Sequence, residues 1–180
     1  KLFNACESVK DRAAIYIVQE AINQKLISKG GTVVEGTAGN TGIGLAIVCK
    51  EYDLKLKIVI PKTQSIKKKK TLKELGAELI EVDAVPYSDP NNYIKQSKKI
   101  AEELNKTEKN GVYWANQFDN TVNTKAHIET TSEEIWNQTA GKIDGFTCAV
   151  GTGGTLSGVS IGLKQKNKNI QIALSDPMGS

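Results

Sequence analysis

Short apolar stretches alternate with longer stretches of helical period along nearly the whole chain of 180 residues. The alternation begins with an apolar run at 32–35, a glycine-rich turn and a helical pattern at 43–52. Strands that alternate with helices favour parallel pairing, because a parallel partner is reached only by crossing over a face of the sheet. The sequence therefore predicts an α/β fold: a mostly parallel sheet with helices on both faces, and ligands beyond the carboxyl ends of its strands.

The same periodicity gives approximate bounds for each element. We expect six strands, at 32–35, 57–60, 78–82, 112–115, 146–150 and 170–174. We expect helices at 8–27, 43–52, 65–76, 91–106, 122–139 and 155–166. Gly30 and Gly31 are expected to end the first helical pattern, and Ser65 and Gly76 fit the N-cap and C′ positions of the third.

Two glycine-rich loops each precede a predicted helix, at 36–42 (GTAGNTG) and at 151–155 (GTGGT). The free backbone N–H groups and the dipole at a helix N-terminus attract anions, and glycine lets the backbone approach them closely. The two loops therefore predict two anion sites, although glycines that only make tight turns remain an alternative.

Several other function classes are disfavoured. A dinucleotide fingerprint beginning at Gly151 needs a third glycine at position 156 for close packing of helix on strand, and Leu156 stands there. No G-x-x-x-x-G-K-[ST] phosphate loop is present. The net charge of +4 is spread over scattered lysines, and the dense run 67–70 covers every side of a helix, so no nucleic-acid partner is expected.

The cysteines and the single histidine do not indicate a metal site. Cys6, Cys49 and Cys148 are odd in number and contain no C-x-x-C pair, which argues against a disulfide framework or a zinc site and fits a reducing intracellular compartment. His127 has no second histidine to pair with, so we expect a structural or interface role for it. No apolar run is long enough to predict a transmembrane segment.

Lys10 is predicted to lie in the first turn of a helix, where a cation opposes the helix dipole but a neutral amine does not. It belongs to an ordered series of four motifs: S-x-K-D-R at 8–12, T-x-G-N-T-G at 37–42, Q-F-x-N at 117–120 and G-T-G-G-T-x-x-G at 151–158. In this order they resemble the cysteine synthase and cystathionine β-synthase family of fold-type II pyridoxal-phosphate enzymes. The likeness spans nearly all of the chain.

The resemblance implies a fold similar to the tryptophan synthase β architecture, with pyridoxal 5′-phosphate as the cofactor. Lys10 would bind the cofactor aldehyde and later act as the base, and Asn40 would contact the ring hydroxyl. The cofactor-binding residues implied are Lys10, Asn40, Gly151, Thr152, Gly153, Gly154 and Thr155. The substrate-binding residues implied are Thr37, Ala38, Gly39, Asn40, Thr41 and Gln117.

The implied activity is β-replacement, which makes L-cysteine from O-acetylserine and sulfide. A condensation like that of cystathionine β-synthase, starting from serine, and a catalytically inactive homologue that acts as a binding module remain open. The resemblance also implies a homodimer. The block 85–93 is similar to a branch from fungal mitochondria, so we expect a mitochondrial location, with the cytoplasm as the alternative.

Two residues depart from the family pattern. Glu7 lies three residues before Lys10, where its carboxylate would raise the lysine pKa unless it points outward. Ala38 replaces a serine that is usual in the substrate loop. We expect residues 1–180 to be part of a catalytic region, with a smaller N-terminal-type domain at about 42–125, because the family extends beyond Ser180 to a residue that meets the pyridine nitrogen.

Overall fold

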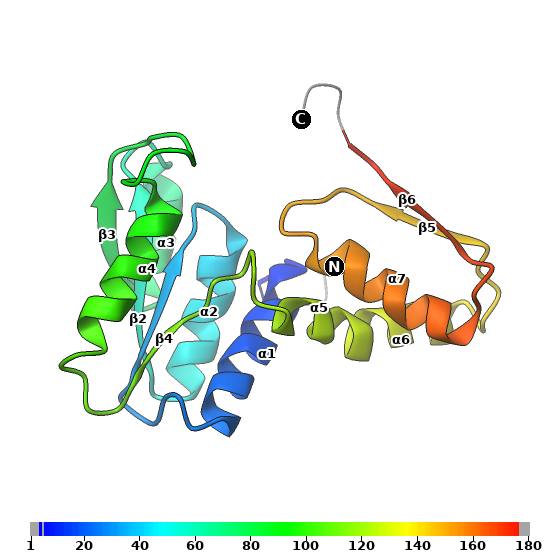
Figure 1. The fold of residues 1–180 in the computed structure, drawn as a ribbon, viewed down its shortest axis with the longest axis horizontal. Coiled ribbons are helices and arrows are strands. Elements are labelled where there is room, and N and C mark those ends of the chain that lie inside the picture. Colours follow the sequence, from blue (N-terminus) through cyan, green and yellow to red (C-terminus); the bar gives the residue numbers. More distant parts are fainter. Residues whose placement is uncertain (1–3, 5, 177–180) are drawn as a thin grey trace. The chain divides into compact units, whose positions relative to one another are not determined.

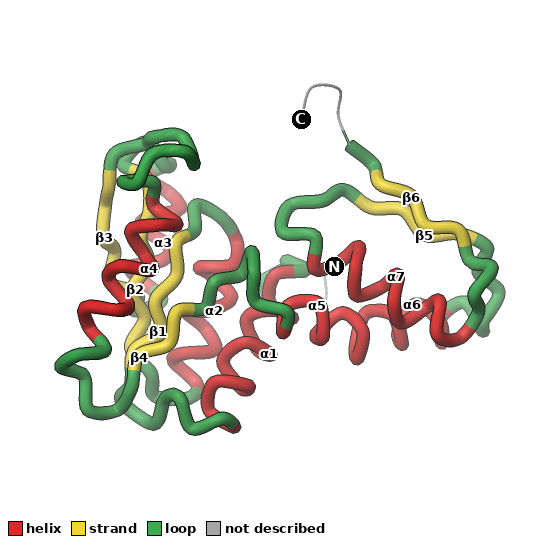
Figure 2. Tube along the Cα trace, in the orientation of Figure 1, coloured by secondary structure: helices red, strands yellow, loops and turns green. Residues whose placement is uncertain are grey.

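The computed structural model describes residue 4 and residues 6–176. The chain divides into two compact units, one up to Gln117 and one from Phe118 onward. Each unit is an arrangement of parallel strands and helices (Figures 1 and 2). The α/β class predicted from the sequence is confirmed, with the strands divided between two sheets.

The first unit contains a four-stranded parallel sheet in the order β3-β2-β1-β4. Its strands are β1 (Thr32–Gly36), β2 (Lys55–Pro61), β3 (Glu78–Val82) and β4 (Val112–Trp114). The chain runs outward from β1 through β2 to β3 and then crosses back to place β4 on the other side of β1. The strand order therefore reverses at β1. Such a reversal opens a crevice at the carboxyl ends of the two strands on either side of it, here β1 and β4.

Helices cover both faces of this sheet (Figure 1). They are α1 (Lys10–Asn23), α2 (Asn40–Glu51), α3 (Ile66–Glu74) and α4 (Tyr93–Leu104). The buried side chains of Val34 and Val59 pack with Ala101 of α4, whereas Ile58 faces Gly42 of α2 on the other side. This alternation is the period of two expected of strands that are buried on both faces.

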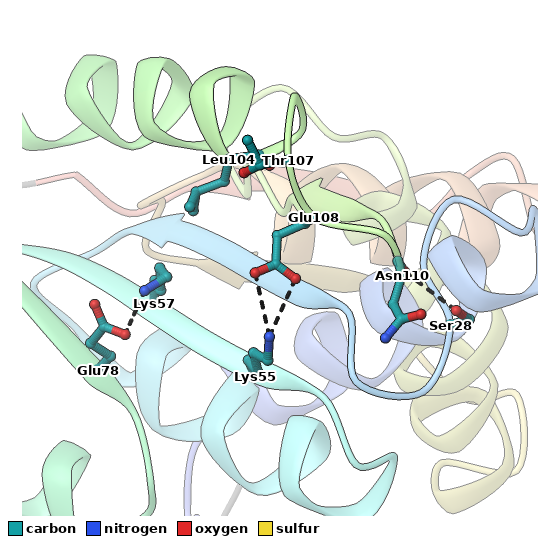
Figure 3. Close-up of polar contacts among 8 residues, drawn as sticks. All are labelled: Ser28, Lys55, Lys57, Glu78, Leu104, Thr107, Glu108 and Asn110. Atoms are coloured by element: carbon teal, nitrogen blue, oxygen red, sulfur yellow. Dashed lines mark hydrogen bonds and ion pairs between the residues drawn. The ribbon is translucent and has the colours of Figure 1, made fainter.

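Polar contacts tie together the amino-terminal edge of the sheet (Figure 3). Lys55, at the start of β2, forms an ion pair with Glu108 at 3.3 Å, and the Ser28 hydroxyl donates to the Asn110 carbonyl at 3.4 Å. A second ion pair joins Lys57 to Glu78 on the neighbouring strand. These contacts lie at the edge opposite the glycine-rich loop that follows β1.

The second unit packs a broken helix against α7. Its elements are α5 (Val122–Ala126), the π-helical turn η1 (His127–Thr131), α6 (Ser132–Gln138), β5 (Gly145–Cys148), α7 (Gly154–Lys166) and β6 (Gln171–Leu174). β5 and β6 pair in parallel. The core holds Val159, Leu163 and Ile170, which are fully buried.

Two helical predictions need correction. The first helix ends at Asn23 rather than at the Gly30–Gly31 pair, because Lys25 adopts a left-handed φ of 59° and the Leu26 N–H bonds back to the Ala21 carbonyl. The single helix expected at 122–139 is interrupted by η1. The caps predicted for the third helix are confirmed, since the Ser65 hydroxyl accepts from the Lys68 N–H and Gly76 has a φ of 92°.

Within the described residues, no helix has both the length and the apolar composition needed to cross a membrane. The same part of the chain contains no group of three or more His, Cys, Asp or Glu side chains arranged to hold a metal ion.

Candidate functional site

The loop 36–42 lies at the point where the strand order of the first sheet reverses. It follows β1 directly, and the segment that follows β4 brings Gln117 to the same edge. The Thr41 hydroxyl donates a hydrogen bond of 2.5 Å to the side-chain oxygen of Gln117, and both residues are buried. Residues 76 positions apart in the sequence thus meet at the predicted ligand-binding edge.

The backbone of this loop is held at several points. The Thr37 N–H donates to the Val59 carbonyl at 3.1 Å, and the Thr37 hydroxyl accepts from the Gly39 N–H at 3.1 Å. Gly39 is the N-cap of α2 and provides no side-chain cap, while Asn40, the first helical residue, is exposed. The free N–H groups of the first turn of α2 therefore favour a carboxylate at this place.

Ala38 is anchored through its carbonyl group. The oxygen accepts from the Gln64 amide at 2.8 Å and from the Lys68 ammonium group at 3.2 Å. Lys68 belongs to the lysine run that the sequence assigned to a solvated surface, yet its amine is directed at the loop. It adds a positive charge close to the predicted carboxylate site.

Glu35 and Asn116 were not identified from the sequence. Glu35 is 1% exposed, and its carboxyl accepts hydrogen bonds from the backbone N–H groups of Asn116 and Gln117 and from the Gln117 side chain. Burial raises its pKa to about 8. A glutamate within a strand pattern otherwise made of Val and Thr was the available signal, because a carboxyl enters a central buried strand only with partners.

Lys10 is the first residue of α1, as the sequence predicted. Its backbone N–H donates to the Ser8 hydroxyl at 3.2 Å, and burial lowers the pKa of its amine. The next residue, Asp11, packs against Gly44 of α2, which brings the start of α1 close to the first turns of α2. A partly desolvated amine at a helix N-terminus is a nucleophile with a reduced preference for the charged form.

The neighbours of Lys10 have separate roles. Glu7 is exposed and has a left-handed φ of 56°. This agrees with the alternative in which its carboxylate points outward. The buried Asp11 accepts from the Cys6 backbone N–H at 2.7 Å. Burial and the Asp11 charge raise the pKa of the Cys6 thiol to about 11, which leaves it a poor nucleophile at neutral pH.

The second predicted loop, 151–155, precedes α7 in the second unit. Gly153 has a φ of 85°, and a Cβ there would meet no atom within 4 Å, so the head of the helix is open. The Thr152 hydroxyl accepts from the Asn123 amide at 2.9 Å. The N–H groups in the first turn of this 13-residue helix lack partners within the helix, as an anion site requires.

His127 has the structural position predicted for it. Its ring nitrogens contact the Thr131 hydroxyl at 2.8 Å and the Thr155 hydroxyl at 3.2 Å, and the side chain is 2% exposed. It therefore links the π-helical turn to the start of α7.

Residues 2–180 match the model of a family described as pyridoxal-phosphate dependent enzymes, and the chain belongs to this family. Its α/β architecture is that of the fold-type II members. A cysteine synthase from Emericella nidulans is 54% identical over 174 residues, which cover 96% of this chain and 46% of the relative. A Saccharomyces cerevisiae relative with "mitochondrial cysteine synthase" in its name is 40% identical over 100% of this chain and 47% of its own length.

Among solved structures, a hydrogen sulfide-producing enzyme from Fusobacterium nucleatum superposes with a TM-score of 0.85. It is 41% identical, and the match covers 98% of this chain and 57% of that protein. The chain spans about half the length of the curated relatives it matches.

The residues on each unit fit pyridoxal phosphate, the cofactor of this family. Lys10 provides an amine whose pKa is lowered by burial, as a group that bonds to an aldehyde needs. The open, left-handed Gly153 at the head of α7 leaves room for a phosphate beside backbone N–H groups. These two observations come from the chain itself and agree with the family match.

Proposed function

We propose that the full-length protein is a pyridoxal-phosphate-dependent cysteine synthase that makes L-cysteine from O-acetylserine and sulfide. The observation that carries this proposal is the Thr41–Gln117 contact at the reversal of the strand order. It joins two of the four motifs at the edge where an α/β sheet binds its ligand. The 54% identity to a cysteine synthase of Emericella nidulans supports the choice of reaction.

We further propose a role for each part of the site. Lys10, Asn40 and the loop 151–155 hold the cofactor, and Thr37, Asn40, Thr41 and Gln117 receive the substrate carboxylate at the start of α2. Ala38 and Gly39 complete this loop through their backbone. When bound, the cofactor supplies an electron sink for the substrate α-carbon.

The residues of the chain then bind and orient the substrate and move its protons. Burial lowers the pKa of Lys10, so that a larger fraction of its amine is neutral and able to take the proton from the α-carbon. The amide and hydroxyl groups of the loop fix the carboxylate, which orients the α C–H bond toward the base. Loss of the acetoxy group and addition of sulfide at the β-carbon complete the replacement.

Assembly, location and domain structure are also proposals. We propose a homodimer and a mitochondrial location, with the cytoplasm as the alternative; the mitochondrial name of the Saccharomyces cerevisiae relative supports the first location. The smaller domain at about 42–125 remains a prediction for the full-length protein.

The test is borohydride reduction of the full-length protein followed by peptide mapping. We expect the reduced cofactor on Lys10 and an absorbance band in the visible range before reduction. Lys10→Arg keeps the charge but loses the reactive amine, so it should lose the label. Lys50→Arg, at an exposed position of α2, should keep it.

Substrate assays separate the candidate reactions. We expect cysteine from O-acetylserine with sulfide, and much slower product formation from serine with a thiol amino acid. The reverse preference would support the cystathionine β-synthase-like condensation. Cofactor on another lysine, or none at all, would contradict the assignment and favour a binding module.

A further inference from the structure

Glu35 lies one residue before the end of β1, directly ahead of the loop 36–42. Its carboxyl is almost fully buried, and it accepts from two consecutive backbone N–H groups, those of Asn116 and Gln117. A single side chain thus fixes the backbone of the segment that follows β4. Burial of a carboxyl in a central strand is costly unless its oxygens accept hydrogen bonds, and these two N–H groups supply such bonds.

The same carboxyl also sets the direction of the Gln117 side chain. A glutamine amide has a donor end and an acceptor end. Its nitrogen end donates to Glu35, and its oxygen end accepts from the Thr41 hydroxyl at 2.5 Å. Because both ends are occupied, the amide is held in one of its two orientations.

The backbone of the segment that follows β4 turns at Asn116. Asn116 has a φ of 45°, a left-handed conformation that asparagine adopts more readily than most residues other than glycine. The N–H groups of Asn116 and Gln117 both bond to the Glu35 carboxyl at this turn, so the carboxyl is placed to hold it.

Two buried acceptor atoms at this place have no hydrogen-bond partner, Glu35 Oε2 and Asn116 Oδ1. A protonated carboxyl has an O–H donor of its own and places no charge on these buried oxygens. Burial raises the pKa of Glu35 to about 8, and the effect of the Glu35 charge on the pKa of Tyr93 places that phenol nearby. A neutral Glu35 also avoids repelling a substrate carboxylate bound at the adjacent loop.

We propose that Glu35 is a positioning residue that acts through Gln117, holding the left-handed turn and the amide orientation that the substrate-carboxylate loop uses. The inference rests on the proposed function, because it assumes that this loop receives a substrate carboxylate.

The test uses three substitutions in the full-length protein. Glu35→Gln keeps an acceptor and the size of the side chain, Glu35→Asp shortens its reach, and Glu35→Leu removes the acceptor. The matched control is Glu78→Gln, which removes a strand carboxylate that is 63% exposed. One readout is hydrogen exchange of the Gln117 backbone N–H in the cofactor-free protein. The other is the KM and kcat for O-acetylserine.

We expect exchange at Gln117 to accelerate in Glu35→Leu and, to a smaller extent, in Glu35→Asp. KM should rise about tenfold or more in Glu35→Leu with kcat changed by less than about threefold, as for lost binding energy. Glu35→Gln keeps an acceptor, so its exchange at Gln117 should be slower and its KM lower than in Glu35→Leu, with both values near those of the wild type. Glu78→Gln should change neither quantity.

Three results would overturn the inference. Faster exchange with an unchanged KM would make Glu35 only structural. Unchanged exchange in both Glu35→Leu and Glu35→Asp would mean that the carboxyl does not hold the turn. A loss of kcat in Glu35→Gln with unchanged KM and exchange would place Glu35 at the reacting atoms. If instead the wild type does not turn over O-acetylserine, the proposed function fails, while the exchange measurement still tests the turn.

Discussion

Replacing Gly158 with alanine probes the packing that places the second glycine-rich loop. Gly154, Gly158 and Gly162 recur every four residues and therefore lie on one face of α7. A Cβ at Gly158 would lie 2.5 Å from both the His127 Cβ and the Thr124 carbonyl oxygen. Carbon atoms in contact prefer about 3.5–4.0 Å, so α7 and the broken helix would have to separate by about 1 Å.

The expected cost follows from competing effects. Overpacking of this kind costs about 1–3 kcal/mol. A shift of His127 would also weaken its contacts to Thr131 and Thr155, each worth about 1 kcal/mol. Alanine recovers about 1 kcal/mol through its higher helix propensity. The net destabilisation is therefore about 2 kcal/mol, which lowers Tm by roughly 4–8 °C for a domain of about 150–250 residues that unfolds as one unit.

The assay is thermal unfolding of the full-length protein, followed by circular dichroism, with cofactor content measured in parallel. Gln165→Ala is the matched control, because Gln165 is exposed on the same helix and its replacement changes propensity without crowding. The control should leave Tm within about 1–2 °C of the wild type. A Gly158→Ala protein that is as stable as the wild type, or more stable, would show that helix propensity outweighs crowding. It would also show that α7 packs loosely against the broken helix.

Three further predictions concern the loops and the buried carboxyl. Gly153→Asp should abolish cofactor retention without unfolding the protein, since aspartate tolerates a φ of 85° but brings a negative charge to the phosphate site; cofactor retained after gel filtration would show that the loop is only a turn. Ala38→Ser restores a hydroxyl to the substrate loop and should speed the first half-reaction with O-acetylserine about two- to tenfold in stopped-flow absorbance, whereas a slower variant would indicate a loop adapted to another substrate. Because burial raises the Glu35 pKa from 4.5 to about 8, the native state binds the extra proton between these values, and stability should fall as pH rises through that range. Urea unfolding at pH 5 to 8 should show a decline of up to about 1.4 kcal/mol per pH unit in the wild type relative to Glu35→Gln, and a pH-independent difference between the two would refute it.

Local signals in the sequence were sufficient for most of the secondary structure. All six strands were predicted within a few residues, because apolar runs with β-branched residues stand between clear helix signals. The first helix was predicted too long, since a lysine in the left-handed conformation gives no signal of its own. The break at η1 was missed for a similar reason: no residue type in the sequence marks a π-helical turn.

The candidate site divides in the same way between local motif and long-range contact. Lys10 and the two glycine-rich loops were visible because each motif is continuous in the sequence and each adjoins a helix N-terminus. Glu35 and Asn116 belong to no motif; Glu35 acts through partners more than 80 positions away, and Asn116 adopts a left-handed φ that no local pattern indicates. Lys68 was assigned to the solvent because helical spacing alone does not show which lysine meets the Ala38 carbonyl.

The sequence by itself determined the α/β class, the order of the elements and the glycine-rich loops that precede helices, because these depend on periodicity, glycine and helix ends within short stretches. Only the tertiary structure decided that the strand order reverses at β1, which brings Gln117 to Thr41. It also decided that the buried Glu35 carboxyl bonds to Gln117 and that the glycines of α7 lie in close contact with the broken helix. These features depend on which strands and helices become neighbours, and that choice is made by packing of the whole chain rather than by any one segment.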